Sequence, residues 1–252
     1  MKLKWLFNLF AKSKQKENQN SIHDERLPWE ELQEEEQEEY EDKQEKERNR
    51  LTLNEYKEAI SLGCLKPCDY EDIWMGSRFL DIDIEDFLKN GFAYLNKIQL
   101  QQNLTMSLKI MKGGTRNFKK IFVSNHAKET ELDIRKHLNV EDSIEGAWQA
   151  FLLRSFLDKI NSIKLFYIFS NDDVNSIKTF RNEDLSNYLL SHDITPYIGK
   201  YNSKYFISYC FFSQWGGLIR QNIEISITNN QIASYRVFQG ISLYRYECGF
   251  MI

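Results

Sequence analysis

Residues 204–252 read KYFISYCFFSQWGGLIRQNIEISITNNQIASYRVFQGISLYRYECGFMI, and this stretch decides the fold. From Ile219 to Thr228, isoleucines alternate with polar residues, which is typical of a strand with one dry face. Asn229 and Asn230 follow, and asparagine tolerates the positive φ angles that a tight hairpin turn requires. The preceding run, Tyr205–Phe212, is apolar at both odd and even positions, which indicates a central strand covered on both faces. We therefore predict a three-stranded antiparallel meander.

The remainder of the body contains both helical and strand patterns. Apolar residues recur at helical spacing over residues 142–162, which predicts a long helix lying across the sheet. The segment 69–76 is expected to be an acidic, aromatic loop. Shorter helices are expected over residues 52–63, 84–90, 92–102, 130–138 and 182–191, and strands over residues 104–112, 118–123 and 164–170. The predicted fold class is α+β, a mainly antiparallel sheet covered by helices.

Charge is distributed unevenly along the chain, whose formal net charge is −4. Residues 1–16 contain five lysines and no acid, whereas residues 17–50 contain fourteen acids and five bases. Residues 51–252 contain 23 charges of each sign. A body without net charge lacks the broad basic face on which nucleic acids bind, so we expect no nucleic-acid partner.

These shifts in composition predict three parts. Residues 1–16 form a basic amphipathic segment, residues 17–50 a charged linker, and residues 51–252 a single α+β domain. The linker has few apolar residues with which to form a core, but its glutamates are good helix formers. It is therefore either a solvated helix or disordered, and we expect it to act as a spacer.

The opening segment has the composition of an interfacial anchor. On a helix, its apolar side chains form a stripe flanked by lysines, each of which adds about 1 kcal/mol of attraction to an anionic lipid surface. The same pattern suits a groove on a partner protein, and a frayed terminus or a poor signal peptide are further interpretations. The candidate anchor residues are Lys2, Leu3, Lys4, Trp5, Leu6, Phe7, Phe10 and Lys12.

The four cysteines, Cys64, Cys68, Cys210 and Cys248, are too few for a disulfide scaffold in a chain of 252 residues. A reducing compartment is the simpler interpretation, so we expect a cytoplasmic protein. No run of about 18 apolar residues is present, which leaves peripheral association as the expected contact with a membrane. The spacing of Cys64 and Cys68 does not match a zinc-binding pair, and we expect no metal and no cofactor.

Two groups of polar residues admit a catalytic interpretation. Asp81 and Asp83 lie in an acidic stretch with the oxygen ligands that Mg²⁺ or Ca²⁺ prefers, although acids ahead of a helix are also expected from capping. Asp133 and His137 are spaced to act as orienter and base for a nucleophile such as Cys210 or Ser213, although a surface ion pair explains them equally well. Neither pattern has the spacing of a specific chemistry, so we assign no catalytic residue.

Aromatic residues beside glycines and acids are typical of protein interfaces. Two glycines after a tryptophan indicate a bulged turn that needs positive φ, or a backbone that another group approaches closely. Ordinary core packing is the alternative interpretation. The tentative binding residues are Tyr70, Trp74, Phe79, Trp215, Gly216 and Gly217.

Together these observations favour a non-enzymatic protein-binding domain. Its layout would suit an inhibitor or immunity partner of a bacterial toxin, which is an association from layout and base rates alone. Two alternatives stay open. One is an enzyme of unmarked type, such as a metal-assisted hydrolase that uses Asp81 and Asp83, and the other is a membrane-surface scaffold.

Overall fold

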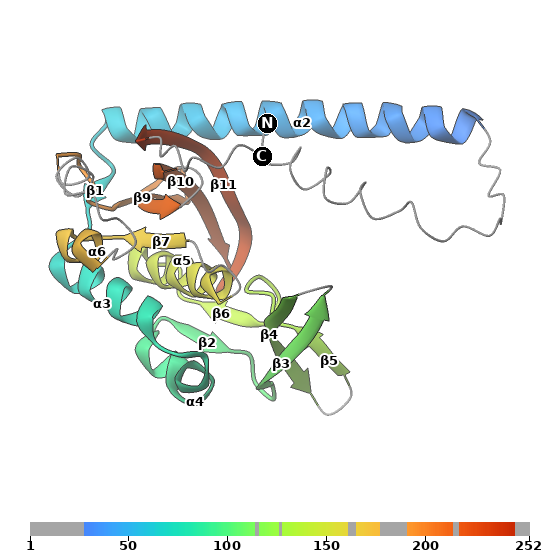
Figure 1. Ribbon diagram of the computed structural model, residues 1–252. Helices are drawn as coiled ribbons and strands as arrows, with labels where there is room; N and C mark the ends of the chain where they lie inside the picture. Colours follow the sequence, from blue (N-terminus) through green and yellow to red (C-terminus); the bar gives the residue numbers. More distant parts are fainter. Residues whose placement is uncertain are drawn as a thin grey trace. The chain divides into compact units, whose positions relative to one another are not determined.

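A computed structural model describes residues 28–113, 116–125, 128–160, 165–176, 191–213 and 217–244 (Figure 1). By its internal contacts the chain divides into residues 1–48 and 49–252. The described helices are α2 (Pro28–Ser61), α3 (Tyr70–Asp81), α4 (Ile84–Tyr94), α5 (Ile144–Lys159) and α6 (Asn171–Ser176). The described strands are β1 (Lys66–Pro67), β2 (Ile98–Leu100), β3 (Thr105–Gly113), β4 (Arg116–Asn125), β5 (Lys128–Glu131), β6 (Leu138–Val140), β7 (Leu165–Ile168), β8 (Tyr197–Tyr201), β9 (Lys204–Ser213), β10 (Gly217–Thr228) and β11 (Gln231–Tyr244).

The main sheet contains the predicted meander. Strands β9, β10 and β11 are antiparallel neighbours, and β8 and β7 pair with the other edge of β9, so β9 is central. Asn229 and Asn230 form the turn between β10 and β11 with φ angles of 52° and 58°. The α+β fold class, with antiparallel sheets and helices, is confirmed.

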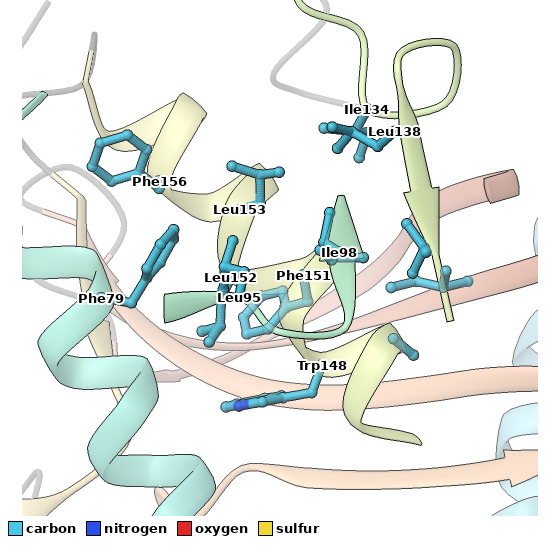
Figure 2. Close-up of a cluster of buried hydrophobic side chains, with 14 of the residues drawn as sticks. Phe79, Leu95, Ile98, Ile134, Leu138, Trp148, Phe151, Leu152, Leu153 and Phe156 are labelled. Carbon is cyan, nitrogen blue, oxygen red and sulfur yellow. The ribbon is translucent and has the colours of Figure 1, made fainter. Parts of the chain in front are cut away.

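Helix α5 packs on the inner face of this sheet. The Ser143 hydroxyl accepts a hydrogen bond from the Gly146 amide at 3.0 Å and caps the helix one residue after the expected start. Every residue from Gly146 to Leu153 is buried, because α3, the sheet and the β2–β6 pair surround the helix. Trp148, Phe151 and Phe156 are among the side chains of this core (Figure 2). The burial is therefore wider than the one-sided stripe that the sequence predicts.

The C-terminal part of α2 covers the outer face of the sheet. Tyr56 packs against Phe206 and Phe238, with ring centroids 6.2 and 5.7 Å away. The polar side of β10 is therefore not solvated as a half-buried strand would predict, and both Asn222 and Glu224 are buried there. A helix start at Thr52 is also wrong, because α2 runs unbroken from Pro28 to Ser61 and good helix formers precede Thr52.

Two smaller sheets complete the domain. Strands β3 and β4 pair as the predicted hairpin, and β5 adds to β4. The helix expected over residues 92–102 is wrong, since Ile98–Leu100 is strand β2 and pairs with β6. The helix expected over residues 130–138 is also wrong, because β5, a turn and the start of β6 occupy that segment.

The acidic stretch 69–76 is a helix rather than the expected loop. Asp69 caps α3 by accepting the Asp72 amide at 2.9 Å, so the acids that suggested a loop belong to a helix start. Helix α4 begins as predicted after Asp83 but continues past Gly91 to Tyr94. The helix expected over residues 182–191 lies, apart from Ser191, outside the described residues.

Candidate functional site

A cleft opens where α5 ends and the main sheet continues. Its volume is about 880 Å³, within the range of sites that hold drug-sized ligands or peptide side chains. The floor is formed by β7, β9, β10 and β11, one wall by the end of α5, and the other wall by residues 128–137. The lining includes Arg135, Lys136, Arg154, Asp158, Tyr167, Tyr209, Phe211, Gln221, Tyr235 and Val237.

Tyrosines dominate the floor of the cleft. The Tyr209 ring lies 4.6 Å from Phe151 and stacks on Tyr167 at 5.8 Å with an interplanar angle of 21°. The Tyr209 hydroxyl donates to Gln221 Oε1 at 3.4 Å. The Tyr235 hydroxyl makes no hydrogen bond to another residue in the described ranges, which leaves a donor at the cleft.

All three hydroxyls are protonated at neutral pH. Burial raises the pKa of Tyr167 to about 12, and burial also raises the pKa of Tyr209 and that of Tyr235 above their ordinary value. The floor therefore presents neutral aromatic surfaces with hydroxyls that donate and accept hydrogen bonds. Sequence reasoning missed these residues. The one signal for them is that Tyr209 and Phe211 are two positions apart in the central strand, so their side chains point to the same face of the sheet.

One wall of the cleft is charged but internally paired. Arg154 Nε lies 3.2 Å from Asp158 Oδ2, and Arg154 Nη2 lies 3.2 Å from Asp158 Oδ1. This fork geometry holds the guanidinium parallel to the carboxylate. Burial raises the pKa of Asp158, and the nearby Arg154 charge opposes that rise.

The opposite wall contains Asp133 and His137. The Asp133 carboxylate does not orient the His137 ring, so the two do not form the catalytic pair that their spacing would allow. His137 Nδ1 accepts the Asp133 main-chain N–H at 2.9 Å, whereas the Asp133 carboxylate accepts the Arg135 amide at 2.9 Å. Cys210 is buried with Phe212 in a separate cluster. Because successive side chains of a strand point to opposite faces, Cys210 faces away from the side of the sheet on which Tyr209 lies. The local turn geometry, rather than a catalytic arrangement, explains this Asp–His spacing.

The edge of the main sheet borders the cleft. Strand β11 pairs only with β10 among the described strands, and Tyr235 and Val237 of β11 line the cleft. Val237 and Ile241 are 54% and 47% exposed. This edge strand of 14 residues mixes apolar and polar side chains, and an unpaired strand edge presents main-chain donors and acceptors to a further strand.

Two of the predicted binding residues are exposed on α3, and one is not. Tyr70 and Trp74 lie one turn apart on the solvent face, with the Arg78 guanidinium 5.0 Å from the Trp74 ring centroid. Phe79 is 1% exposed and packs on Phe87 at 6.2 Å, so its assignment to a binding surface is corrected. In the helix, Phe79 lies among the buried side chains of the core (Figure 2), whereas Trp74 is 51% exposed.

The other predicted residues are only partly described. Gly217 begins β10 with a φ of +74°, which is the conformation that favours glycine there. Trp215 and Gly216 lie outside the described residues, as do all eight candidate anchor residues of the opening segment. Within the described ranges, no hydrogen bond joins Gly217 to α3.

The acidic and cysteine groups are dispersed or engaged. Asp83 caps α4, accepting the amides of Glu85 and Asp86 at 2.8 Å, and Asp81 Oδ1 lies 2.8 Å from Lys159 Nζ. Cys64, Cys68 and Cys210 belong to three different clusters of the core, and Cys248 lies outside the described residues. Among the described residues, no three His, Cys, Asp or Glu side chains converge as metal ligands would.

Comparison with known proteins identifies no relative. No protein-family profile matches the chain, and no curated protein or solved structure is significantly similar to it. Within the described ranges, the helices include none with the length and apolar character needed to cross a bilayer.

Proposed function

We propose that this chain is a non-enzymatic protein-binding domain that adds an extended segment of a partner polypeptide to the edge of β11. The observation that carries the proposal is the position of the cleft beside that edge, since Tyr235 and Val237 belong to both. In strand addition, main-chain hydrogen bonds supply affinity and pockets for alternate side chains supply specificity.

The edge meets the first requirement of this mode of binding. Residues 234–242 pair with β10 on one side, and no other described strand pairs with the second side. Natural edge strands are usually protected by charge, proline or a covering element. Arg236 and the register shifts in the β10–β11 pairing give β11 some of this protection, but Val237 and Ile241 are exposed on it, which favours a partner segment over that part of the edge.

The cleft meets the second requirement. Side chains of an extended segment alternate, so every second residue of a strand added to β11 points to the face that contains Tyr167 and Tyr209. An aromatic or aliphatic side chain would stack on those rings, and the Tyr235 hydroxyl would donate to a carbonyl or carboxylate. The partner segment is therefore expected to combine an apolar residue with an acceptor two positions away.

The way in which the polar groups are engaged supports binding over catalysis. Asp158 is held by Arg154, the Asp133 carboxylate by Arg135, and the His137 ring by a main-chain N–H. A general base needs its accepting nitrogen or oxygen directed at a substrate. An inhibitor or immunity partner of a toxin is one class of protein within this proposal.

Affinity capture with a matched set of variants tests the proposal. The tagged chain is purified gently from its own cell, and the complex is identified by native mass spectrometry. The edge variant Val237→Lys/Ile241→Lys places charge on β11, which disfavours strand addition. The control Ile60→Lys/Leu62→Lys replaces two apolar residues of comparable exposure, one in the last turn of α2 and one just after it.

A stoichiometric polypeptide is expected on the wild-type chain and the control, and not on the edge variant. Tyr235→Ala is expected to weaken the same complex without removing the fold. Equal capture by the edge variant and the control would refute strand addition at β11. Loss of the partner only in Trp74→Ala would instead place the binding surface on α3.

A further inference from the structure

The hairpin of β3 and β4 extends past the core of the domain. Leu108 pairs with Ile121 on the face that packs inward, and Ile121 is buried. One step further along the same face, Ile110 pairs with Lys119, and Ile110 is 62% exposed. Ile110, two positions nearer the hairpin end than Leu108, is therefore exposed where Ile121 is buried.

Three large apolar side chains are exposed at this end. Met111 and Phe118 are register partners on the second face, and both are exposed together with Ile110 on the first face. Isolated exposed apolar residues are ordinary, but three on both faces of one hairpin end form an apolar tip. We call Ile110, Met111 and Phe118 the hairpin tip.

Basic residues flank the hairpin tip along the sequence, and one of them, Lys119, lines a pocket together with Asp81 and Asp83. Residues 105–125 contain five basic residues and neither aspartate nor glutamate. Lys109 and Lys120 pair with Glu129 and Glu131 of β5, which lies against the opposite end of β4. The segment 110–119, beyond those glutamates, contains Lys112, Arg116 and Lys119 and no acid.

We propose that the hairpin tip docks on an anionic lipid surface, with its apolar side chains in the headgroup region and its lysines against lipid phosphates. Apolar groups flanked by cations are the composition of interfacial membrane contacts. Residues 1–16 have the same chemistry, with five lysines and no acid, and two weak contacts in one chain reinforce each other. This surface is separate from the β11 edge proposed for partner binding.

The apolar side chains decide between a membrane and nucleic acid. A phosphate backbone attracts cations, but it makes no favourable contact with an isoleucine, a methionine and a phenylalanine exposed among them. The body as a whole has no net charge, so it provides no broad basic face around the hairpin. An anionic lipid surface binds both kinds of side chain, because its headgroups attract the cations and its acyl boundary takes up the apolar groups.

Cosedimentation of the full chain with vesicles tests the proposal. The vesicles contain phosphatidylcholine alone or phosphatidylcholine with phosphatidylserine. We expect binding only to the anionic vesicles, weakened roughly fivefold by Lys112→Gln and roughly tenfold or more by Ile110→Gln/Met111→Gln. The control Ile60→Gln/Leu62→Gln is expected to bind as the wild type does, and Leu62 has the same 62% exposure as Ile110.

A second full-length variant, Leu6→Gln/Phe7→Gln, separates the hairpin from the opening segment. Additive losses in the two variants support two contacts. Loss of binding in this variant with no change in Ile110→Gln/Met111→Gln would overturn the proposal, as would equal binding to vesicles without phosphatidylserine. Far-UV circular dichroism checks that each variant keeps the fold. A chain that shifts duplex DNA and ignores the vesicles would also overturn it.

Discussion

Replacing Lys204 by methionine leaves the buried carboxylate of Glu224, in the main sheet, without its cationic partner. Glu224 is 1% exposed, and Lys204 Nζ lies 3.4 Å from its Oε2 and 2.6 Å from Glu55 Oε2. No hydrogen bond satisfies Glu224 Oε2 among the described residues. Burial lowers the pKa of Lys204, but the two carboxylates outweigh it and the pKa is raised overall. The lysine charge is therefore what makes a buried glutamate tolerable at this position.

The structure sets the size of the effect. Removing one partner of a buried ion pair costs about 3–5 kcal/mol, and we expect about 3 kcal/mol because the Lys204 side chain is 29% exposed. At a urea dependence of about 3 kcal/mol per molar, the unfolding midpoint falls by about 1 M. Equilibrium unfolding in urea, followed by far-UV circular dichroism, measures this shift.

Two further variants make the test specific. Lys200→Met, on the neighbouring strand, removes a lysine that pairs with exposed Asp142 and donates to the Tyr205 hydroxyl at 2.8 Å, so about 1 kcal/mol is expected. Glu224→Gln in the Lys204→Met background removes the stranded charge and is expected to recover at least about 1 kcal/mol. A Lys204→Met cost no larger than that of Lys200→Met, or no recovery in the double variant, would refute this reasoning.

Four other variants test three separate features of the fold. Burial and neighbouring acids raise the pKa of Asp72 to about 6, so the native state holds a proton that the unfolded chain releases and stability declines from pH about 4 to about 6. Asp72→Asn is therefore expected to be more stable at pH 7.5 by about 1 kcal/mol, after discounting for solvent screening, and not at pH 4. A Cβ at Gly199 would lie 2.1 Å from the Cys64 carbonyl oxygen, so Gly199→Ala is expected to lower the free energy of unfolding by about 3 kcal/mol or more. Phe79→Ala is expected to cost about 3–5 kcal/mol and Trp74→Ala about 1 kcal/mol or less, and equal costs in urea unfolding would contradict their placement.

The C-terminal meander was predictable because its information is local. Alternation and two asparagines with positive φ specify two strands and their turn. The burial of Asn222 and Glu224 was not predictable, because it depends on residues 49–61 of α2 packing on that face. A polar face indicates solvent only when no distant element covers it.

The middle of the chain shows the opposite case. Strands β2 and β6 are three residues each, and Ile98 pairs with Val140 far along the chain. Short strands whose partners are distant leave no periodic pattern, so local propensity predicted helices there instead. The hairpin of β3 and β4, by contrast, pairs neighbouring segments and was predicted.

The candidate site could not be assembled from the sequence. Tyr167, Tyr209 and Tyr235 come from β7, β9 and β11, and they share a cleft because the sheet order and the end of α5 leave that part of the floor open. The exposed aromatic residues on α3 were predictable as residues of interest. Their segment was predicted as a loop, so the inward direction of Phe79 was missed.

Amide hydrogen exchange along β11, measured with and without the captured partner, tests strand addition most directly. In the free chain, amides of residues 234–242 that do not pair with β10 are expected to exchange faster than those of the central strand β9. In the complex, the same amides are expected to become protected while α3 is unchanged. Unchanged exchange in β11, with protection appearing on α3 or elsewhere, would contradict the proposed binding mode.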